Sequence, residues 1–529
     1  MHHPLRTLRR SRRHHPPQGV FLKLYSADEM SRADTGAQNL GIPGGVLMER
    51  AGAAMAEEIL ARYPSRRLRS LGLRALAVCG GGNNGGDGFV ISRELHRTGV
   101  EVTVVATKDE YEGDPGTNLE ILRNLGIEIH GPEDLDELLD GTDLVVDALL
   151  GTGFSGEVRE KEAGLIRQLN DAGTTTVAVD VPSGVDGSTG EVQGEAVRAD
   201  LTICAHAAKI GCVISPGREH AGEVAVLDIG IPPEADVEPT VAWTDAALLR
   251  GTIPRTAEPA HKYSAGALLV VAGTYKMTGA PVMVVEGAQR TGCGIVFLAT
   301  SQSAASAVDL RLTEALVYGV LEDESGQMVS GALEQVLEQA RRATALVVGP
   351  GMGTGDESRQ LVEGILREVG APVLLDADAI SNLSGSDALA QRAAPTVITP
   401  HPGELSRLIE TGTKELQARR LHSAREAAQK YGCCVLLKGS DTIVAEGERT
   451  AVNSTGNVAL ATAGTGDVLS GAIGALLSRG MEPYEATRTG AWVHGRASEL
   501  WGEETGLPAE SFIATDLLPY LPRAIAEVV

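Results

Sequence analysis

The sequence lacks a long apolar run, a paired cysteine motif and an excess of basic residues. No stretch approaches the ~18 apolar residues that a membrane-spanning helix needs, so we expect no membrane partner. None of the six cysteines forms a C-x-x-C pair, which argues against a structural zinc site. Several lie in apolar runs, as Cys79 does, and we interpret them as buried free thiols in a reducing, cytoplasmic compartment.

Basic residues number 46 against 70 acidic residues, which gives a formal net charge of −24. Such an acidic chain is a poor candidate for binding nucleic acid. Residues 1–17 are the exception, with five arginines, four histidines and no acid. They lack the apolar segment of a secretory signal, so we expect residues 1–21 to form a disordered basic arm.

Glycine is abundant, at 64 of 529 residues against a usual ~7%, which is typical of many tight βα turns. Short apolar runs alternate with helical patterns on both sides of a proline-rich stretch at 231–259, and residues 26–62 have a helical pattern. This alternation predicts an α/β fold with mostly parallel sheets. We place a domain boundary within the proline-rich stretch, near 240–255, and expect domains over 22–245 and 255–529. The expected strands are 75–79, 102–106, 144–148, 176–180, 201–205, 224–229, 267–272, 295–299, 346–348, 373–376, 396–398, 435–438 and 442–445.

In the second half, Gly464 and Gly466 stand just before Asp467, and an apolar helical pattern follows. Glycines let the backbone turn tightly, and the start of a helix carries about half a positive charge, so the N–H groups there form an anion hole suited to phosphate. A carboxylate at this place would repel phosphate unless it takes part in the reaction. Its obvious role is to take a proton from a hydroxyl that receives a phosphoryl group. The motif therefore predicts an enzyme that brings a nucleotide to an alcohol.

Four more segments of the second half fall at the ends of predicted strands, where ligands gather in open α/β sheets. Taken alone, an aspartate at a strand end is more often a cap, and His401 is more often a structural turn residue. Gly351 and Gly353 alone indicate only a turn. The four segments are 349–353, 375–379, 399–404 and 438–442.

Together these motifs resemble the ADP- or ATP-dependent NAD(P)H-hydrate dehydratase family, which has a ribokinase-like fold, over residues 255–525. The resemblance implies that Asp467 is the catalytic base, which accepts the proton of the C6 hydroxyl as phosphate is transferred to it. Phosphate is a far better leaving group than hydroxide, so dehydration follows. The implied contacts to the hydrated nicotinamide are Ala280, Gly351, His401 and Asp467. The implied binding residues for ADP, which carries Mg²⁺, are Lys438, Gly439, Ser440, Asp441, Thr442, Gly464, Thr465 and Gly466.

In the first half, a glycine-rich loop follows a predicted strand and opens a helix. Its residues 80–85 satisfy G-x-G-x-x-G, and Asp109 could be the later acid of a Rossmann dinucleotide site. A plain NAD-dependent dehydrogenase is therefore an alternative. Two features argue against it: the long helical segment before the loop, and the polar residues Asn83, Asn84 and Asp87, where Rossmann loops favour small apolar residues.

Two aspartates of the first half, Asp147 and Asp180, end predicted strands and lead into glycine-containing loops. With Asn84 they could gather oxygen atoms around one hard cation such as K⁺. Taken singly, each aspartate is as readily a turn cap.

This set resembles the NAD(P)H-hydrate epimerase domain over residues 25–230. The resemblance implies K⁺ ligands at Asn84, Asp147 and Ser183, and Asp180 is our candidate for the catalytic proton shuttle. The implied substrate contacts are Asn83, Asn84, Gly85, Gly86, Asp87, Gly151, Thr152, Gly153, Phe154, Ser155, Gly156, Glu157 and Asp180.

We therefore expect two three-layer αβα domains, Rossmann-like in the N-terminal half and ribokinase-like in the C-terminal half. The expected enzyme epimerises the R and S forms of hydrated NADH and NADPH (NADHX and NADPHX) at C6. It then dehydrates the S form at the expense of ADP, giving AMP and phosphate. We also expect a homo-oligomer. One rival is a ribokinase-like kinase for a small alcohol, fused to a dinucleotide-binding module; another is a module that senses dinucleotides without turnover.

Overall fold

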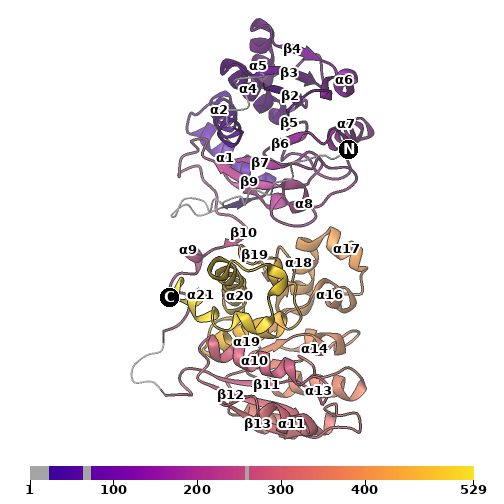
Figure 1. Ribbon diagram of the computed structural model, residues 1–529, viewed down its shortest axis with the longest axis vertical. Coiled ribbons are helices and arrows are strands. Elements are labelled where there is room, and N and C mark those ends of the chain that lie inside the picture. The colour runs from indigo at the N-terminus through magenta and orange to yellow at the C-terminus, as the bar shows by residue number, and fades with distance from the viewer. Residues whose placement is uncertain (1–22, 64–72, 256–260) are drawn as a thin grey trace.

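The structure is a computed structural model that describes residues 23–63, 73–255 and 261–529. The basic arm expected at 1–21 lies outside the described residues. The chain forms two α/β halves stacked along the long axis of the molecule (Figure 1). None of the described helices combines the length and the apolar character needed to cross a membrane.

The N-terminal half is built on a parallel sheet with the strand order β4-β3-β2-β5-β6-β7-β9. Its strands are β2 (Arg74–Cys79), β3 (Glu101–Ala106), β4 (Glu128–His130), β5 (Leu144–Ala148), β6 (Thr175–Val179), β7 (Leu201–Ala205) and β9 (Glu223–Leu227). Its helices are α1 (Ala27–Asn39), α2 (Gly44–Arg62), α4 (Asn83–Arg97), α5 (Gly113–Asn124), α6 (Leu135–Leu139), α7 (Glu160–Ala172) and α8 (Arg218–Ala221).

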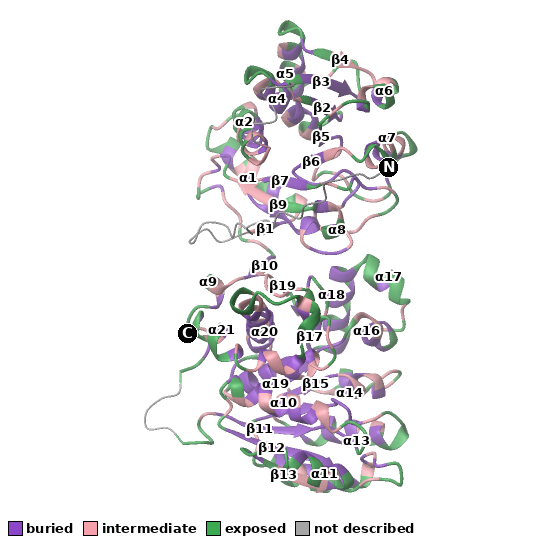
Figure 2. Ribbon diagram, in the orientation of Figure 1, coloured by how far each residue is buried: buried purple, intermediate pink, exposed green. Residues whose placement is uncertain are grey.

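Both faces of this sheet are covered, so its strands read as continuous apolar runs rather than alternating ones. In β2, Ala75 and Ala77 pack in the core under α1, α2, α4 and α5, whereas Leu76 and Val78 pack in the core under α6 and α7. The central strands β2, β5, β6 and β7 are accordingly buried, whereas the edge strands β4 and β9 are partly exposed (Figure 2).

The C-terminal half is built on a larger sheet with the strand order β13-β12-β11-β14-β15-β16-β17-β18-β19-β10-β1-β8. The segment from β13 to β17 is parallel, and β18 pairs antiparallel with both β17 and β19. Its strands are β11 (Ala267–Val271), β12 (Ile295–Ser301), β13 (Ala315–Val320), β14 (Ala345–Val348), β15 (Val373–Leu375), β16 (Thr396–Ile398), β17 (Cys434–Leu437), β18 (Ile443–Glu446), β19 (Arg449–Asn453), β10 (Val241–Thr244), β1 (Leu24–Tyr25) and β8 (Ala208–Lys209).

Helices cover both faces of this sheet as well. In β11, Leu268 and Val270 face the core shared with α10, α19, α20 and α21, and Leu269 and Val271 face the core shared with α12, α13, α16 and α18. The two three-layer αβα domains expected from the sequence are thereby confirmed. The helices are α9 (Ala246–Leu249), α10 (Gly279–Arg290), α11 (Gln302–Asp309), α12 (Leu333–Ala340), α13 (Asp356–Glu368), α14 (Asp378–Asn382), α15 (Ala388–Gln391), α16 (Pro402–Leu408), α17 (Thr413–Ala418), α18 (Arg420–Tyr431), α19 (Thr465–Ser478), α20 (Pro483–Thr505) and α21 (Leu521–Ala526).

The two halves are joined through the second sheet. Strand β10, which lies inside the range 22–245 expected for the first domain, pairs in parallel with β19 over four residues. Strand β1, at the start of the described chain, pairs with β10 on one side and with β8 on the other. Backbone hydrogen bonds therefore run from the second sheet into the first half.

The structure refines several sequence expectations. The helical segment at 26–62 is divided into α1 and α2, because Pro43 is the N-cap of α2 and the chain turns before it. All six cysteines are free, as expected, and all but Cys293 are buried. The strands that the sequence did not indicate are β1, β4, β8, β10, β13 and β19, most of which are short or carry polar residues.

Candidate functional site

A cavity of about 950 Å³ opens at the carboxyl ends of the first sheet. It is lined by loop residues that the sequence singled out: Asn83, Asn84, Asp87, Gly151, Thr152, Gly153, Phe154, Ser155, Glu157 and Asp180. Gly85 and Gly86 are buried in the first turn of α4 behind this wall, and Gly156 does not line the cavity. Asp109, the acid that a Rossmann dinucleotide site would need, does not line it either.

The glycines of the first loop are required by close backbone contacts. A Cβ atom on Gly85 would lie 1.9 Å from the carbonyl oxygen of Gly80, and one on Gly80 would lie 1.8 Å from the carbonyl oxygen of Leu149. Only glycine lets the loop and the end of β5 approach each other so closely. These contacts place Asn83 and Asn84 at the mouth of the cavity.

Asp180 follows β6 in a left-handed backbone conformation, with φ of 68°. Its Oδ1 accepts a hydrogen bond from Nζ of Lys209 at 2.5 Å and another from the backbone N–H of Ala205 at 3.1 Å. Lys209 is completely buried and also donates to two backbone carbonyl groups. Burial alone would lower the pKa of Lys209, but the charge of Asp180 raises it above its ordinary value. Lys209 therefore keeps its charge inside the wall of the cavity, beside the carboxyl group of Asp180.

Among the other carboxyl groups that line the cavity, those of Asp34 from α1 and Asp87 from α4 have raised pKa values. Burial raises the pKa of Asp34 to about 6, with a further contribution from the charge of Asp180 and an opposing one from Lys209. Burial and the charges of Asp180 and Asp34 raise the pKa of Asp87 well above its ordinary value. The cavity thus combines one ion pair with two carboxyl groups that take up protons readily.

A set of oxygen atoms gathers below this cavity around the end of β5. Asp147 is completely buried and accepts hydrogen bonds from the backbone N–H of Ser183 at 2.8 Å and from its hydroxyl at 2.6 Å. The Ser183 hydroxyl also contacts the carbonyl oxygen of Leu150, which accepts a hydrogen bond from the Asn84 amide. Burial raises the pKa of Asp147 to about 6. Among the described residues, no basic side chain forms an ion pair with Asp147, so a buried carboxylate stands here without a counter-charge.

In the second half, Asp376, Lys438 and Asp467 meet where β15, β17 and α19 come together. Nζ of Lys438 donates to Oδ1 of Asp376 at 2.6 Å, and the Ser470 hydroxyl donates to Oδ2 of Asp376 at 2.7 Å. A Cβ atom on Gly466 would lie 3.5 Å from Nζ of Lys438, so the lysine also borders the first turn of α19. Asp376 is buried and fixes the lysine at this place.

Asp467 lies in the first turn of α19, which begins after Gly464 in a left-handed conformation with φ of 93°. Burial raises the pKa of Asp467 to about 7, with the charge of Asp376 adding to the effect and Lys438 opposing it. A carboxyl group with a pKa near neutrality can take and release a proton at physiological pH, as a general base must. The role of Asp467 as a general base stays a prediction from the motif.

The other residues expected around the hydrated nicotinamide come from neighbouring strand ends. His401 is the N-cap of α16: its Nδ1 accepts the N–H groups of Gly403 and Glu404, so in this arrangement the proton is on Nε2. The backbone N–H of Lys438 donates to the carbonyl oxygen of Pro400, which places His401 beside the lysine strand.

A second pair of expected contact residues lies together on the other side of this edge. A Cβ atom on Gly351, whose φ is 62°, would lie 3.3 Å from Cβ of Ala280, so these two residues are neighbours. The backbone N–H of Gly353 donates to Asp378 at 2.9 Å. The charge of Asp378 in turn contributes to the raised pKa of Asp467, after burial and Asp376. The ends of these strands therefore lie around one candidate site at the carboxyl edge of the second sheet.

The loop 438–442 touches the first half of the chain. Asp441 is buried, and its Oδ2 accepts hydrogen bonds from the backbone N–H of Ser215 and from Nε of Arg420, each at 2.9 Å. Arg218 of α8 donates to the carbonyl oxygen of Ser440. The carboxylate of Asp441 therefore faces the first half, and the shape of the loop depends on residues more than 220 positions away in the chain.

The sequence predicts that this loop binds the nucleotide. We therefore expect that replacing Arg218 with alanine raises the KM for the nucleotide by about 3- to 10-fold, because one hydrogen bond that holds the loop is worth ~1 kcal/mol. The turnover number should stay close to that of the wild type, since Arg218 lies away from Asp467. Initial rates at varied nucleotide concentration check this. Arg198→Ala, which removes another exposed arginine of the first half, is the matched control; equal KM values for the two variants would contradict the expectation.

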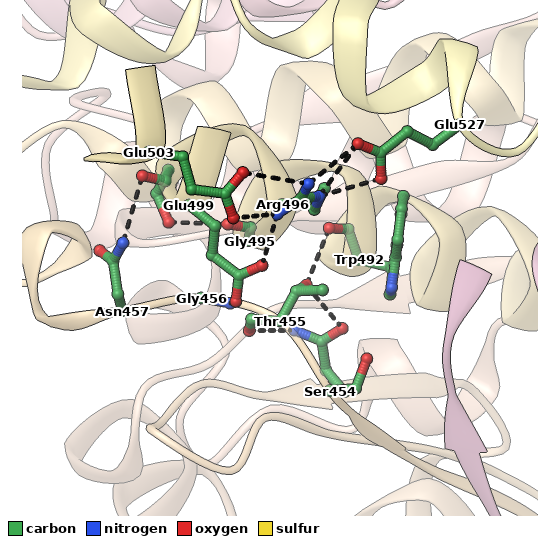
Figure 3. A network of polar contacts seen from close by, with 12 residues as sticks. Ser454, Thr455, Gly456, Asn457, Trp492, Gly495, Arg496, Glu499, Glu503 and Glu527 are labelled. Atoms are coloured by element: carbon green, nitrogen blue, oxygen red, sulfur yellow. Dashed lines mark hydrogen bonds and ion pairs between the residues drawn. The ribbon is translucent and has the colours of Figure 1, made fainter. Parts of the chain in front are cut away.

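Residues 455–456, which precede the glycine motif, are held against α20 by hydrogen bonds (Figure 3). Thr455 donates to the carbonyl oxygen of Trp492 at 2.8 Å, and the backbone N–H of Gly456 donates to Glu499 at 3.0 Å. Arg496 binds Glu499 in turn, as well as Glu503 and Glu527. These contacts fix the position of the segment that leads to the first turn of α19.

The same helix α20 also reaches the motif itself. His494 is buried and its Nε2 lies 2.9 Å from the carbonyl oxygen of Thr465. Burial lowers the pKa of His494 to about 4, so the ring stays neutral and adds no charge beside the first turn of α19.

Sequence reasoning missed several residues of these sites. The partnership of Asp180 with Lys209 and that of Asp376 with Lys438 join residues 29 and 62 positions apart, and no local pattern indicates such pairs. Asp34 lies in the helical pattern at 26–62, and no motif in the sequence indicates a function for it. Arg420 donates hydrogen bonds to Asp441 and to the carbonyl oxygen of Lys438, and no motif indicates this role either.

The two domains, each with polar residues gathered at the carboxyl ends of parallel strands, define a class of protein: a two-domain α/β enzyme with small-molecule sites. Comparison with known proteins is more specific. Residues 268–523 match the family model described as NAD(P)H-hydrate dehydratase, and residues 44–211 match the one described as YjeF-related protein N-terminus.

Curated relatives match both halves together. A bifunctional NAD(P)H-hydrate repair enzyme of Thermofilum pendens is 37% identical over 500 residues, covering 92% of this chain and 93% of that protein. The enzyme of the same name from Salinibacter ruber is 38% identical over 517 residues, covering 93% of each chain. The ADP/ATP-dependent NAD(P)H-hydrate dehydratase of Bacillus subtilis, crystallised with ATP and Mg²⁺, is 30% identical and covers 55% of this chain and 99% of that one, with a TM-score of 0.47.

The chain belongs to the family of bifunctional NAD(P)H-hydrate repair enzymes. The family-level expectation from the sequence, an epimerase domain followed by a dehydratase domain, is thereby confirmed.

Proposed function

We propose that the chain repairs hydrated nicotinamide cofactors in two steps, epimerising NADHX and NADPHX at C6 and dehydrating the S form at the expense of ADP. The observation that carries the proposal is the position of Asp467 in the glycine-bounded first turn of α19, with Lys438 beside it and a pKa near 7. A carboxyl group with that pKa at an anion-binding helix start suits proton removal during phosphoryl transfer.

In the dehydratase step, Asp467 accepts the proton of the C6 hydroxyl as the phosphoryl group arrives. The backbone N–H groups of Gly464, Thr465 and Gly466, together with Lys438, stabilise the negative charge that the transferred group carries. The lone pair of the ring nitrogen then helps to expel phosphate, and loss of a proton from C5 restores the dihydropyridine. Asp376 holds Lys438 in place for this task.

The nucleotide and the substrate are bound by the surrounding strand ends. Lys438–Thr442 and Gly464–Gly466 hold ADP, mainly through backbone groups, because the carboxylate of Asp441 faces Ser215 and Arg420. Ala280, Gly351 and His401 contact the hydrated ring.

Mg²⁺ fits as the companion of the nucleotide, since a phosphate-bound Mg²⁺ needs only one or two carboxylates. In the described parts of the chain no three His, Cys, Asp or Glu residues converge as a metal site of their own.

In the epimerase step, the substrate occupies the cavity between α1, α4 and the ends of β5 and β6. Asp180 moves a proton to or from the C6 oxygen while Lys209 keeps its charge balanced. The oxygen atoms of Asp147, Ser183 and Asn84, with a buried carboxylate that lacks a basic partner, fit a K⁺ ion. When bound, that ion would supply the counter-charge for Asp147 and for the phosphates of the dinucleotide.

The pKa of Asp467 predicts how the dehydratase step depends on pH. A general base works in its ionised form, and a pKa of about 7 means that this form is lost as the pH falls through 7. We therefore expect kcat/KM for dehydration to fall by about tenfold per pH unit below pH 7 and to level off above it. The rate of NADH formation from S-NADHX at saturating ADP, measured from pH 5 to 9, checks this; a flat profile between pH 5 and 7 would contradict it.

A direct assay tests the whole proposal. Purified full-length protein is mixed with an R and S mixture of NADHX and with ADP, and the absorbance of reduced nicotinamide is followed. We expect complete conversion of both epimers to NADH, with one phosphate and one AMP released for each. A stable phosphorylated product without NADH would favour the small-alcohol kinase instead, and conversion of only half of the mixture would mean that the first domain does not epimerise.

A further inference from the structure

One face of α1 lines the epimerase cavity. The residues concerned follow helical spacing: Ala27, Met30, Ser31, Asp34 and Gln38. Positions three, four and seven apart lie on the same side of a helix, so this stripe is a continuous wall of the cavity. Asp34 is the only ionisable residue of the stripe, and it lies in the middle of it.

The wall formed by α1 is held firmly at its start. Ser26 and Glu29 form a reciprocal capping box, and the backbone N–H of Ala27 donates to the Ser188 hydroxyl at 2.9 Å. Glu29 is buried and also accepts the backbone N–H of Thr240 at 2.6 Å. The position of Asp34, two turns later, is therefore determined by the fold.

We propose that Asp34 is the second acid–base residue of the epimerase and acts on the face of C6 opposite to the one served by Asp180. The inference rests on the proposed function of the cavity. Asp180 projects from the end of β6 at the sheet edge and Asp34 from α1, so the two carboxyl groups come from different walls. Exchange of a hydroxyl between two faces of one carbon needs a proton donor on one face and an acceptor on the other.

The charges around the two groups suit these roles. Asp180 is bound to Lys209, whereas no described side chain forms a hydrogen bond or ion pair with Asp34. The charged groups facing Asp34 are Asp87 from α4, Asp180 from the end of β6 and Lys209 from β8. With a pKa of about 6, Asp34 holds a proton in part of the molecules at neutral pH. Two carboxyl groups in different surroundings, one bound to a lysine and the other without a partner, are typical of acid–base pairs.

The reaction balances with one proton on the pair. Asp34 gives its proton to the C6 hydroxyl, the C6–O bond breaks, and the lone pair of the ring nitrogen forms the N1=C6 bond as water leaves. A water molecule on the other face adds to C6 and gives its proton to Asp180. The proton has then moved from one wall to the other, which is the state needed for the reverse reaction, and exchange with solvent resets the pair.

The test uses the full-length chain with S-NADHX and no ADP, so that only epimerisation occurs, and spontaneous exchange is subtracted. We expect Asp34→Asn to lower kcat for formation of the R epimer by ~10²–10⁴, with KM within about threefold of the wild type. The wild-type rate should fall by about tenfold per pH unit above pH 6, as Asp34 loses its proton, and this decline should be absent from the residual activity of the variant.

Asp28→Asn on the exposed side of the same helix is the matched control and should leave both measurements unchanged. Dehydration of S-NADHX with ADP, measured in the same preparations, shows that each variant is folded. Wild-type kcat in Asp34→Asn, or a change confined to KM with the wild-type pH profile, would overturn the proposal. Absence of exchange in the wild type would instead refute the epimerase function of the cavity.

Discussion

Replacing Asp467 with asparagine should lower turnover of the dehydratase reaction by ~10²–10⁴, the usual contribution of a positioned general base. Asparagine has nearly the same shape but cannot accept the hydroxyl proton. The expected loss is in kcat, because the nucleotide is bound by backbone groups of the loops around Asp467. Formation of NADH from S-NADHX at saturating ADP measures it.

The same substitution should not lower thermal stability. Asp467 is destabilised as an anion by burial and by the charge of Asp376, which is why its pKa is raised to about 7, and asparagine carries no charge. Asp356→Asn, in the exposed first turn of α13, is the matched control and should keep full activity. Dehydration by Asp467→Asn at near the wild-type rate would remove Asp467 from the mechanism, and a fall in melting temperature would point to a structural effect instead.

Replacing Lys209 with methionine should destabilise the protein by ~3–5 kcal/mol, because it leaves Asp180 without its partner in the wall of the cavity. Lys209 is completely buried, and methionine at this position offers no hydrogen bond to Oδ1 of Asp180. Epimer exchange should also be lost, since Lys209 would no longer hold the Asp180 carboxyl group in place. The midpoint of urea unfolding of the full-length chain, together with the exchange assay, measures both effects.

A double variant separates the charge from the packing. Asp180→Leu combined with Lys209→Met removes both charges, and it should regain most of the lost stability while remaining without epimer exchange. Lys161→Met, at an exposed position of α7, is the control for the loss of a lysine as such. Unchanged unfolding of the single Lys209→Met variant would show that the buried pair contributes nothing to the fold.

Much of the fold could be predicted because its signals are local. Runs such as 144–148 and 201–205 were placed at the correct residues, since a buried parallel strand is a short apolar run between turns. Strands β1 and β8 could not be placed, because two residues carry no periodic pattern. Residues 241–244, which form β10, fell in the first half by their position in the sequence, whereas their hydrogen bonds join them to the second sheet.

In the candidate sites, too, some residues are indicated by local sequence patterns and others only by the tertiary structure. The glycines around Asp467 and in the loop at 80–85 act on their own backbone, so the sequence alone indicated two glycine-rich loops, with Asp467 beside one of them. The sequence did not indicate a role for Asp34, because that role depends on which face of α1 lines the cavity. Arg218 and Ser215 gave none either, because they act on a loop of the other half.

The amino-acid sequence by itself therefore determined the two α/β domains, the family and the place of Asp467 at the start of a helix, since each depends on neighbours within a few residues. Only the tertiary structure decided which charges meet: Lys209 with Asp180, Lys438 with Asp376, and Asp441 with a backbone group 226 positions away. The physical reason is that the electrostatic environment of a carboxyl group depends on distance in space and on exclusion of water. Both arise only when the strand ends and the covering helices come together.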